Sequence, residues 1–161
     1  WFNLRNTKER CMNIEIRKPQ ITEIPQLVEL CALHAEYEKY DFDKTGKAEK
    51  LSQFLFSENP PLHCYIAVVD GEMAAYTTFS KQFSTWQAMH YIHMDCLFVL
   101  ESHRGKVIGE MLVNKVKDFA KESNCTQIQW QTPHDNVRAI KFYHRIGGKA
   151  KQKLRYYLNI Q

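Results

Sequence analysis

The chain has 161 residues, of which 44% are hydrophobic, and it carries a formal net charge of +4. This length and composition exclude a mostly disordered chain and favour a domain with its own hydrophobic core. The sequence contains no apolar run of the roughly 20 residues that a membrane-spanning helix needs, and the small net charge gives little support for a nucleic acid partner. We therefore expect a cytoplasmic protein that acts on neither a membrane nor a nucleic acid.

Two further features of the composition bear on organisation. Met12 resembles a natural start, so we interpret residues 1–11 as an upstream remnant or added segment and 12–161 as a single domain. The five cysteines are scattered and contain no CxxC pair, so we predict buried reduced thiols, no disulfide framework and no metal cofactor.

Charge is distributed unevenly along the chain. Residues 103–161 hold 12 Lys and Arg against 4 Asp and Glu, a balance of +8, whereas residues 1–102 hold 10 against 14, a balance of −4. The two balances sum to the net charge of +4. Such a division is typical either of separate sites for an anionic and a cationic ligand or of an unevenly charged, solvated surface.

Hydrophobic periodicity predicts strands and helices in alternation. In chain order they are a strand at 13–17, helices at about 22–40 and 47–57, strands at 62–69, 72–79 and 88–99, a helix at 107–119, a strand at 126–132, a helix at 136–146 and a closing strand at 154–160. Asp70-Gly71 between two apolar runs is a strong signal for a β-hairpin. The order predicts an α/β fold in which a mixed, mostly antiparallel central sheet has helices on both faces.

Residues 101–119, ESHRGKVIGEMLVNKVKDF, join a turn to the start of a helix. Arg104 and Lys106 bring two cations to the helix end whose free N–H groups and positive dipole attract anions. The segment is therefore a candidate phosphate site, and an ordinary surface helix with solvated cations is the alternative. The apolar residues recur at three- and four-residue steps and form one predicted stripe: Val107, Ile108, Met111, Leu112, Val116 and Phe119.

Asp95 is an acid within an otherwise apolar predicted strand. The two-residue period of a strand would place it on one face with Tyr91, His93 and Leu97. It is either a functional group or a buried carboxylate paired with a cation.

These motifs, in this order and spacing, resemble the GNAT family of N-acetyltransferases. The family signature is Gln or Arg, two variable residues, Gly, one variable residue, then Gly or Ala, and the sequence has RGKVIG at 104–109. NVRAIKFYHRIGG at 136–148 is similar to the family's second cofactor region. YEKY, HCYIAVV, MDCLFV and FYHRIGG resemble the diamine (spermidine/spermine-type) branch, and the likeness covers residues 14–158.

The resemblance implies a GNAT fold and acetyl-CoA as cosubstrate, with its pyrophosphate against the backbone amides of 105–110. The cofactor-binding residues that it implies are Leu97, Phe98, Val99, Arg104, Gly105, Lys106, Val107, Ile108, Gly109, Glu110, Asn136 and Ala139. Val107 stands where the family has glycine. We expect Val107 to keep right-handed helical dihedrals, with its side chain on the apolar stripe.

The resemblance also implies roles in catalysis. Asp95 aligns with the family's catalytic glutamate and would hold the substrate ammonium and pass its proton to solvent, while Tyr143 would protonate the departing thiolate. Tyr37 and Glu38 resemble substrate-binding positions of the diamine branch. The competing interpretations are packing for Tyr143 and solvated helix charge for Glu38.

The implied function is an acetyl-CoA-dependent N-acetyltransferase that transfers acetyl directly, in a ternary complex, to a primary amine of a small cationic, polyamine-like substrate. A homodimer is expected. The alternatives are an aminoglycoside or protein/peptide N-acetyltransferase and a catalytically weak CoA-binding regulatory module. A nucleic-acid-binding domain is disfavoured, because the late aromatic residues are spaced as core residues and not as a stacking series.

Overall fold

The computed structural model describes residues 12–160. The chain divides into two compact units, 1–130 and 131–161, and each is described by itself. Residues 1–11 lie outside the described part, so their interpretation as an added segment stays a prediction, as does the single domain. No helix in the described part is long and apolar enough to cross a membrane.

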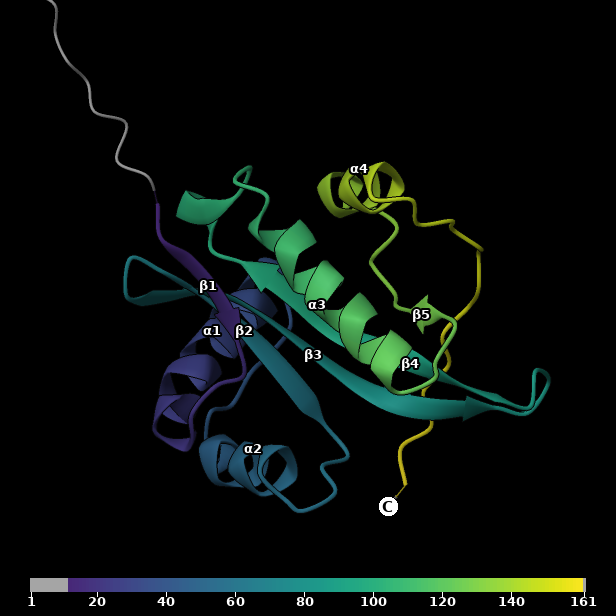
Figure 1. Ribbon diagram of the computed structural model, residues 1–161, viewed down its shortest axis with the longest axis horizontal. Helices are drawn as coiled ribbons and strands as arrows, with labels where there is room; N and C mark the ends of the chain where they lie inside the picture. The colour runs from purple at the N-terminus through teal and green to yellow at the C-terminus, as the bar shows by residue number, and fades with distance from the viewer. Residues whose placement is uncertain (1–11, 161) are drawn as a thin grey trace, which may run out of the picture. The chain divides into compact units, whose positions relative to one another are not determined.

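The first unit is built on one five-stranded sheet in the order β1-β2-β3-β4-β5 (Figure 1). Strands β1 to β4 pair antiparallel with their neighbours, and β5 joins β4 in parallel. The predicted mixed, mostly antiparallel sheet is therefore confirmed. The strands are β1 (Ile14–Arg17), β2 (His63–Val69), β3 (Glu72–Ser84), β4 (Met89–Val99) and β5 (Ile128–Gln129).

The hairpin between β2 and β3 turns at Asp70 and Gly71, as predicted. Their φ angles are 50° and 91°, and two positive values match the right-handed twist of strands joined by a two-residue turn. The Asp70 N–H donates to the Asn13 oxygen at 2.9 Å, and the Asp70 carboxylate accepts from the Asn13 N–H at 3.1 Å. The turn thereby fixes the start of β1 against the hairpin.

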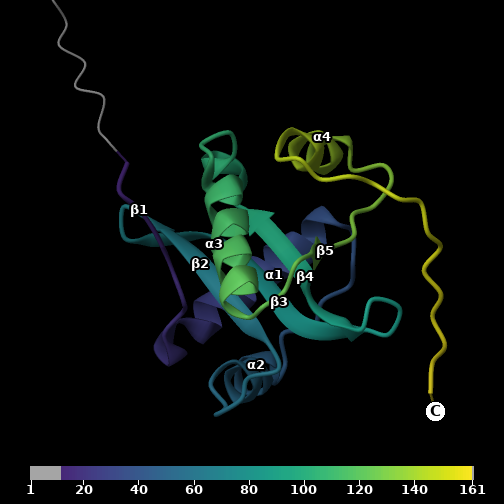
Figure 2. The same ribbon diagram turned by 45° about the vertical axis from the view of Figure 1, so that its right-hand side comes forward.

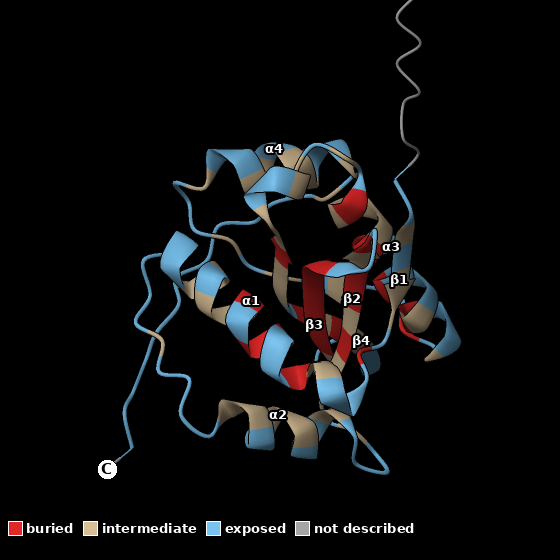
Figure 3. Cartoon of the chain, turned by 90° about the vertical axis from the view of Figure 1, so that its left-hand side faces the viewer, coloured by how far each residue is buried: buried red, intermediate tan, exposed pale blue. Residues whose placement is uncertain are grey.

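Helices cover both faces of the sheet, as Figures 1 and 3 show. α1 (Ile24–Tyr37) and α2 (Lys47–Leu55) lie on one face, and α3 (Ile108–Glu122) lies on the other, across the middle strands (Figure 2). Two short 3-10 helices, η1 (Ile21–Glu23) and η2 (Glu101–His103), precede α1 and α3. Because side chains alternate along a strand, the sheet supplies a separate hydrophobic core to each face.

The two cores differ in the helices that they join to the sheet. The buried residues of the α1 core are Ile24, Leu27, Val28, Leu30, Cys64, Ile66, Met73, Tyr76 and Phe98. The α3 core contains Ala67, Val69, Ala74, Ala75, Ile108 and Leu112. Phe98 of β4 lies in the α1 core, whereas Leu97 and Val99 pack partly buried against the α3 core, so the end of β4 lies between α1 and α3.

α1 begins and ends for local reasons. Pro25 lies in its first turn, where a missing N–H costs nothing, and Arg17 donates two hydrogen bonds of 2.7 Å to Glu23 just before it. The helix ends at Tyr37, three residues before the predicted end, because Lys39 adopts a left-handed φ of 57°. The C-terminal turn of α1 consequently presents Tyr37 and Glu38.

The second unit contains α4 (Val137–Arg145). The predicted helix start at 136 is close to the observed one, and Asn136 is the N-cap: its side-chain oxygen accepts a hydrogen bond from the Ala139 N–H at 3.2 Å. The helix ends where Gly147 adopts a φ of 90° and the Gly148 N–H donates to the Tyr143 oxygen at 2.8 Å.

Two predicted strands need correction. The strand at 126–132 is reduced to Ile128–Gln129, and the closing strand at 154–160 is wrong, because those residues form no secondary structure and their side chains are exposed. Alternating apolar residues indicate which face a strand would bury, but a strand also needs a neighbour for its backbone hydrogen bonds. In the described chain no strand pairs with 154–160.

Candidate functional site

The candidate site lies next to the point where β4 and β5 stop pairing. Their pairing is limited to Ile92 with Ile128 and His93 with Gln129, and the Ile92 N–H donates to the Gln127 oxygen at 3.0 Å. Beyond His93, no strand of residues 12–160 pairs with that side of β4. Residues 94–99 therefore present an open strand edge, whose backbone groups can bind an extended ligand.

Asp95 lies at a β-bulge in this open segment. Thr78 pairs with Cys96 and Phe79 pairs with Met94, so Asp95 is the extra residue of β4. The predicted common face of Tyr91, His93, Asp95 and Leu97 is not kept, because the bulge interrupts the two-residue period: Leu97 packs against the α3 core, whereas Asp95 lies within electrostatic reach of His34 on α1. Asp95 is exposed, and within residues 12–160 it forms no ion pair, so the interpretation as a buried salt bridge is also wrong.

Leu97, Phe98 and Val99 follow the bulge on the same open edge. Phe98 is buried in the α1 core, whereas Leu97 and Val99 pack partly buried against the α3 core. Packing therefore fixes the side chains on both faces of this end of β4, while its unpaired backbone edge remains available to a ligand.

Val107 corrects the expectation for the turn before α3. It has φ 57° and ψ 3°, which is left-handed, and it is the N-cap of α3 and not a residue of the first helical turn. Its side chain is 57% exposed, so it does not belong to the apolar stripe. Packing against the sheet begins one residue later: the buried residues of α3 are Ile108, Leu112, Val113, Val116 and Ala120.

The turn at 105–110 presents a row of free backbone amides. α3 has no side-chain cap, and its first backbone hydrogen bond runs from the Met111 N–H to the Val107 oxygen at 3.0 Å. No acceptor within the described residues takes a hydrogen bond from the N–H groups of 105–110. Gly105, with φ 77°, and Val107 together give the turn two left-handed residues. Free N–H groups at a helix N-terminus are the arrangement that binds phosphate.

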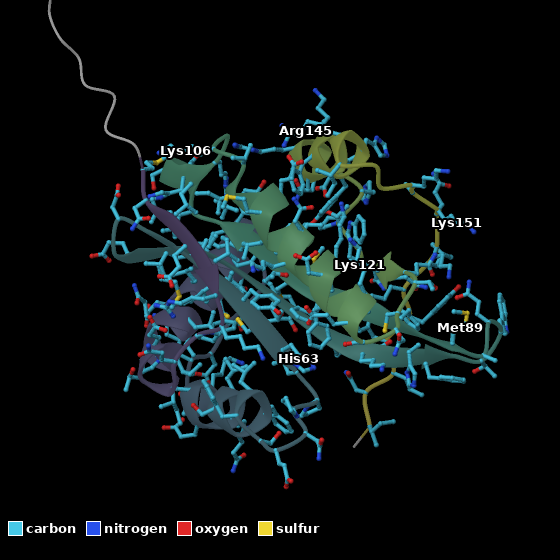
Figure 4. The ribbon with its side chains drawn as sticks, viewed as in Figure 1. His63, Met89, Lys106, Lys121, Arg145 and Lys151 are labelled. Atoms are coloured by element: carbon cyan, nitrogen blue, oxygen red, sulfur yellow. The ribbon has the colours of Figure 1, made fainter. Side chains whose placement is uncertain are left out.

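Arg104 and Lys106 differ in their surroundings. The Arg104 Nε donates to the Val99 oxygen at 2.9 Å, and the guanidinium carbon lies 4.6 Å from the centre of the Tyr37 ring and 5.7 Å from that of Phe98. Arg104 thus joins the end of β4 to α1. Lys106 lies in the loop between η2 and α3, as Figure 4 shows.

His34 is a residue of the site that the sequence analysis missed. Its Nδ1 lies 2.9 Å from the Tyr76 hydroxyl and its Nε2 lies 3.5 Å from the Glu38 carboxylate. The ring stacks on Phe98 with centroids 5.0 Å apart, and burial lowers the pKa of His34. The sequence does contain a sign of this contact: His34 and Glu38 are four residues apart, a spacing that brings two side chains together on the surface of a helix.

The structure brings the predicted residues of the first unit together. Tyr37 contacts Arg104 through its ring, and His34 is held by Glu38 and lies within electrostatic reach of Asp95 and Arg104. The remaining predicted residues, Asn136, Ala139 and Tyr143, belong to α4 of the second unit, where the Tyr143 and Phe142 rings lie 5.3 Å apart. Their roles stay predictions.

Comparison with protein families identifies the family of this chain. Residues 27–148 match the model of the acetyltransferase (GNAT) family. The chain is 29% identical over 123 residues to a thialysine N-epsilon-acetyltransferase of Sus scrofa, with 71% of this chain and 72% of that protein covered.

Solved structures give the same result for the fold. The chain resembles an integron cassette protein from the mobile metagenome of V. cholerae with a TM-score of 0.74 and 27% identity, and 92% of this chain and 93% of that chain are covered. It also resembles an aminoglycoside N-acetyltransferase in complex with CoA with a TM-score of 0.78 and 16% identity, over 94% of this chain and 97% of that chain.

Proposed function

We propose that this chain, which belongs to the GNAT family and is an acetyl-CoA-dependent N-acetyltransferase, acetylates a primary amine of a small cationic, polyamine-like substrate. The transfer is direct, in a ternary complex. The observation that carries the proposal is the exposed Asp95 carboxylate at the bulge, on the same open edge of β4 that leads to the free amides of the turn.

The residues of the first unit fit acetyl-CoA. The free N–H groups of 105–110 suit its pyrophosphate, and Lys106 adds a cation beside them. The open edge at 97–99 can pair with the amides of an extended pantetheine arm, and Asn136 with Ala139 would contribute from α4. When bound, acetyl-CoA supplies an acetyl group activated as a thioester.

The protein also presents negative charge that complements a cationic acceptor amine. Asp95 is exposed and forms no ion pair within the described chain, so its carboxylate is available to an ammonium group. Glu38 and Tyr37 at the end of α1 add a second carboxylate and an aromatic ring, which favour a cation. A relative named thialysine N-epsilon-acetyltransferase supports an amine on a short aliphatic chain.

Each proton has a proposed place. Asp95 receives a proton of the acceptor ammonium, directly or through water, so that the nitrogen lone pair forms the new C–N bond. The amides at the end of β4 donate to the acetyl carbonyl oxygen, and the Tyr143 hydroxyl gives its proton to the sulfur as the C–S bond breaks. The nitrogen loses its second proton as the amide forms, and that proton returns through water to the Tyr143 phenolate, while the first leaves Asp95 for solvent. A phenol and a thiol, with ordinary pKa values of about 10 and about 8.5, are close enough for this exchange.

A thiol-release assay tests the function. Acetyl-CoA is offered with a panel of aliphatic polyamines, thialysine, aminoglycosides and lysine-containing peptides. Turnover that is fastest with a small aliphatic amine supports the proposal, and turnover that is confined to aminoglycosides or peptides contradicts it. Saturable acetyl-CoA binding without turnover of any amine would indicate a CoA-binding regulatory module, a candidate that the non-glycine Val107 in the phosphate turn favours.

We further propose that the protein is a homodimer in the cytoplasm. Light scattering of the purified chain at several concentrations tests the assembly, and a monomeric mass throughout would contradict it.

A further inference from the structure

α1 carries a histidine that is enclosed by the α1 core. The His34 side chain is 15% exposed, stacks on Phe98 and meets Tyr76 edge-on with centroids 5.9 Å apart. A polar ring in such a place needs partners for both nitrogens, and it has them in Tyr76 and Glu38.

The partners define the tautomer of the ring. A carboxylate only accepts hydrogen bonds, so the hydrogen of the neutral His34 ring lies on Nε2, toward Glu38. Nδ1 is then an acceptor, and the Tyr76 hydroxyl donates to it. The charged groups that face the ring are Glu38 at the C-cap of α1, Asp95 of β4 and Arg104 after η2. Burial has the largest effect on the pKa of His34, which it lowers.

A second set of polar contacts connects Tyr76 to Asp95, the proposed proton acceptor. The Tyr76 hydroxyl interacts with the Cys96 thiol, and burial raises the pKa of that thiol to about 12, so it keeps its hydrogen. The Cys96 sulfur donates to the Asp95 carboxylate over 3.7 Å. A series of polar contacts therefore leads from Glu38 through His34, Tyr76 and Cys96 to Asp95.

We propose that His34 is a positioning residue of the acceptor site, which holds the Glu38 carboxylate so that it receives the second ammonium group of a diamine acceptor. The inference rests on the proposed function, because it requires a cationic acceptor. The Glu38 side chain is 38% exposed, so one part of its carboxylate can be held by Nε2 while the rest is open to a ligand. Without the His34 ring, the Glu38 carboxylate would sample several rotamers. Binding of a diamine would then be weaker, because the entropy of those rotamers would be lost on binding.

Kinetics with two matched acceptors test the proposal. His34→Leu should raise KM for 1,4-diaminobutane about tenfold, the effect of losing one hydrogen bond to a charged group, and should change KM for butylamine little. His34→Gln should recover most of this loss, because its amide can donate to Glu38 and accept from Tyr76. His63→Leu is the control: His63 is a half-buried histidine that contacts Phe119 near the other end of α3 from Lys106, and its loss should leave both KM values unchanged (Figure 4).

A double-mutant cycle separates positioning from packing. If His34 acts through Glu38, His34→Leu should have no further effect on the KM for 1,4-diaminobutane in a Glu38→Gln background, within about twofold. An equal loss in both backgrounds, or an equal loss with butylamine, would overturn the proposal, because packing alone would then explain it.

Nuclear magnetic resonance of His34 gives a test that needs no turnover. The ring should show the Nε2–H tautomer, and both Glu38→Gln and addition of 1,4-diaminobutane should lower its pKa, because each removes or neutralises the carboxylate that stabilises the charged ring. An Nδ1–H tautomer, or a His34 resonance that does not respond to the diamine, would refute the positioning role. If His34 responds as expected but no amine in the panel is acetylated, the proposed function fails while the binding role of His34 stands.

Discussion

The Arg104 guanidinium joins two elements that lie far apart in the sequence: its Nε donates to the Val99 oxygen at 2.9 Å, and it lies over the Tyr37 ring at 4.6 Å. Neither contact involves the free amides of the turn. We therefore expect Arg104 and Lys106, two cations in one motif, to have separable roles, the first in the architecture of the site and the second in anion binding.

Arg104→Lys should lower the free energy of unfolding by about 1.5 kcal/mol, because an ammonium group cannot reproduce the Nε hydrogen bond together with the contact on the Tyr37 ring. Acetyl-CoA affinity should fall little. Lys106→Ala should do the opposite, with unchanged stability and weaker acetyl-CoA binding. Urea unfolding and calorimetric titration with acetyl-CoA measure the two effects, and equal losses of affinity in both variants would contradict the assignment.

Asp95→Asn should reduce kcat, and the loss should be largest at low pH, where the acceptor amine is most fully protonated and depends most on a group that takes its proton. Glu15→Gln is a suitable control, because Glu15 is an exposed carboxylate on β1, at the other edge of the sheet. The pH profiles of kcat and of kcat/KM are the measurements. A profile that Asp95→Asn leaves unchanged would remove Asp95 from the proton transfer.

Tyr143→Phe should lower kcat by about a hundredfold, the lower part of the range for loss of a general acid, while acetyl-CoA still binds. The matched control is Tyr156→Phe, which removes a phenol hydroxyl from a side chain that is 85% exposed. Steady-state rates and acetyl-CoA dissociation constants of both variants provide the comparison. Full activity of Tyr143→Phe would leave packing as the role of Tyr143.

The sheet, its hairpin and the α4 cap could be predicted because each depends on local signals. The hairpin turn depends only on the backbone conformation of Asp70 and Gly71 themselves. The helix cap depends only on a hydrogen bond between Asn136 and the Ala139 amide three residues later. The bulge at Asp95 could not be predicted, since a bulge is defined by the pairing of Thr78 and Phe79 on another strand. For the same reason, the contacts that hold His34 are invisible in the sequence: Tyr76 is 42 residues away.

Stability should depend on pH through the two histidines that burial affects. Burial lowers the pKa of both His34 and His63 from the ordinary value of 6.5. Below about pH 6.5 the unfolded chain therefore binds more protons than the folded one, so the free energy of unfolding falls as the pH decreases. The contribution of the two neutral histidines to the free energy of unfolding is complete above about pH 6.5. It is lost as the pH falls from there through the pKa values of the two histidines in the folded chain. Urea unfolding between about pH 7.5 and 5 measures it, and His34→Gln with His63→Gln should give a flatter profile.

Val107→Gly should stabilise the protein, the reverse of what a residue inside a helical turn would show. A β-branched residue at a φ of 57° is strained by about 1–2 kcal/mol, and glycine adopts this conformation freely. The side chain is 57% exposed, so little packing is lost. Glycine also has greater freedom in the unfolded chain, which reduces this gain by about 0.5–1 kcal/mol, so we expect a net gain in stability of between zero and about 1.5 kcal/mol.

Val107→Ala separates the two causes, because alanine retains most of the strain of a left-handed residue but removes the branched side chain from the turn. If the side chain obstructs the phosphate, both Val107→Ala and Val107→Gly should tighten acetyl-CoA binding. If only backbone strain matters, the glycine variant alone should gain stability, and the affinity should change by less than about threefold in either variant. We expect the second outcome, because the amides of 105–110 are already free while Val107 is present. Urea unfolding without ligand and calorimetric titration with acetyl-CoA measure the two quantities separately, and a glycine variant less stable than the parent chain would contradict the left-handed assignment of Val107.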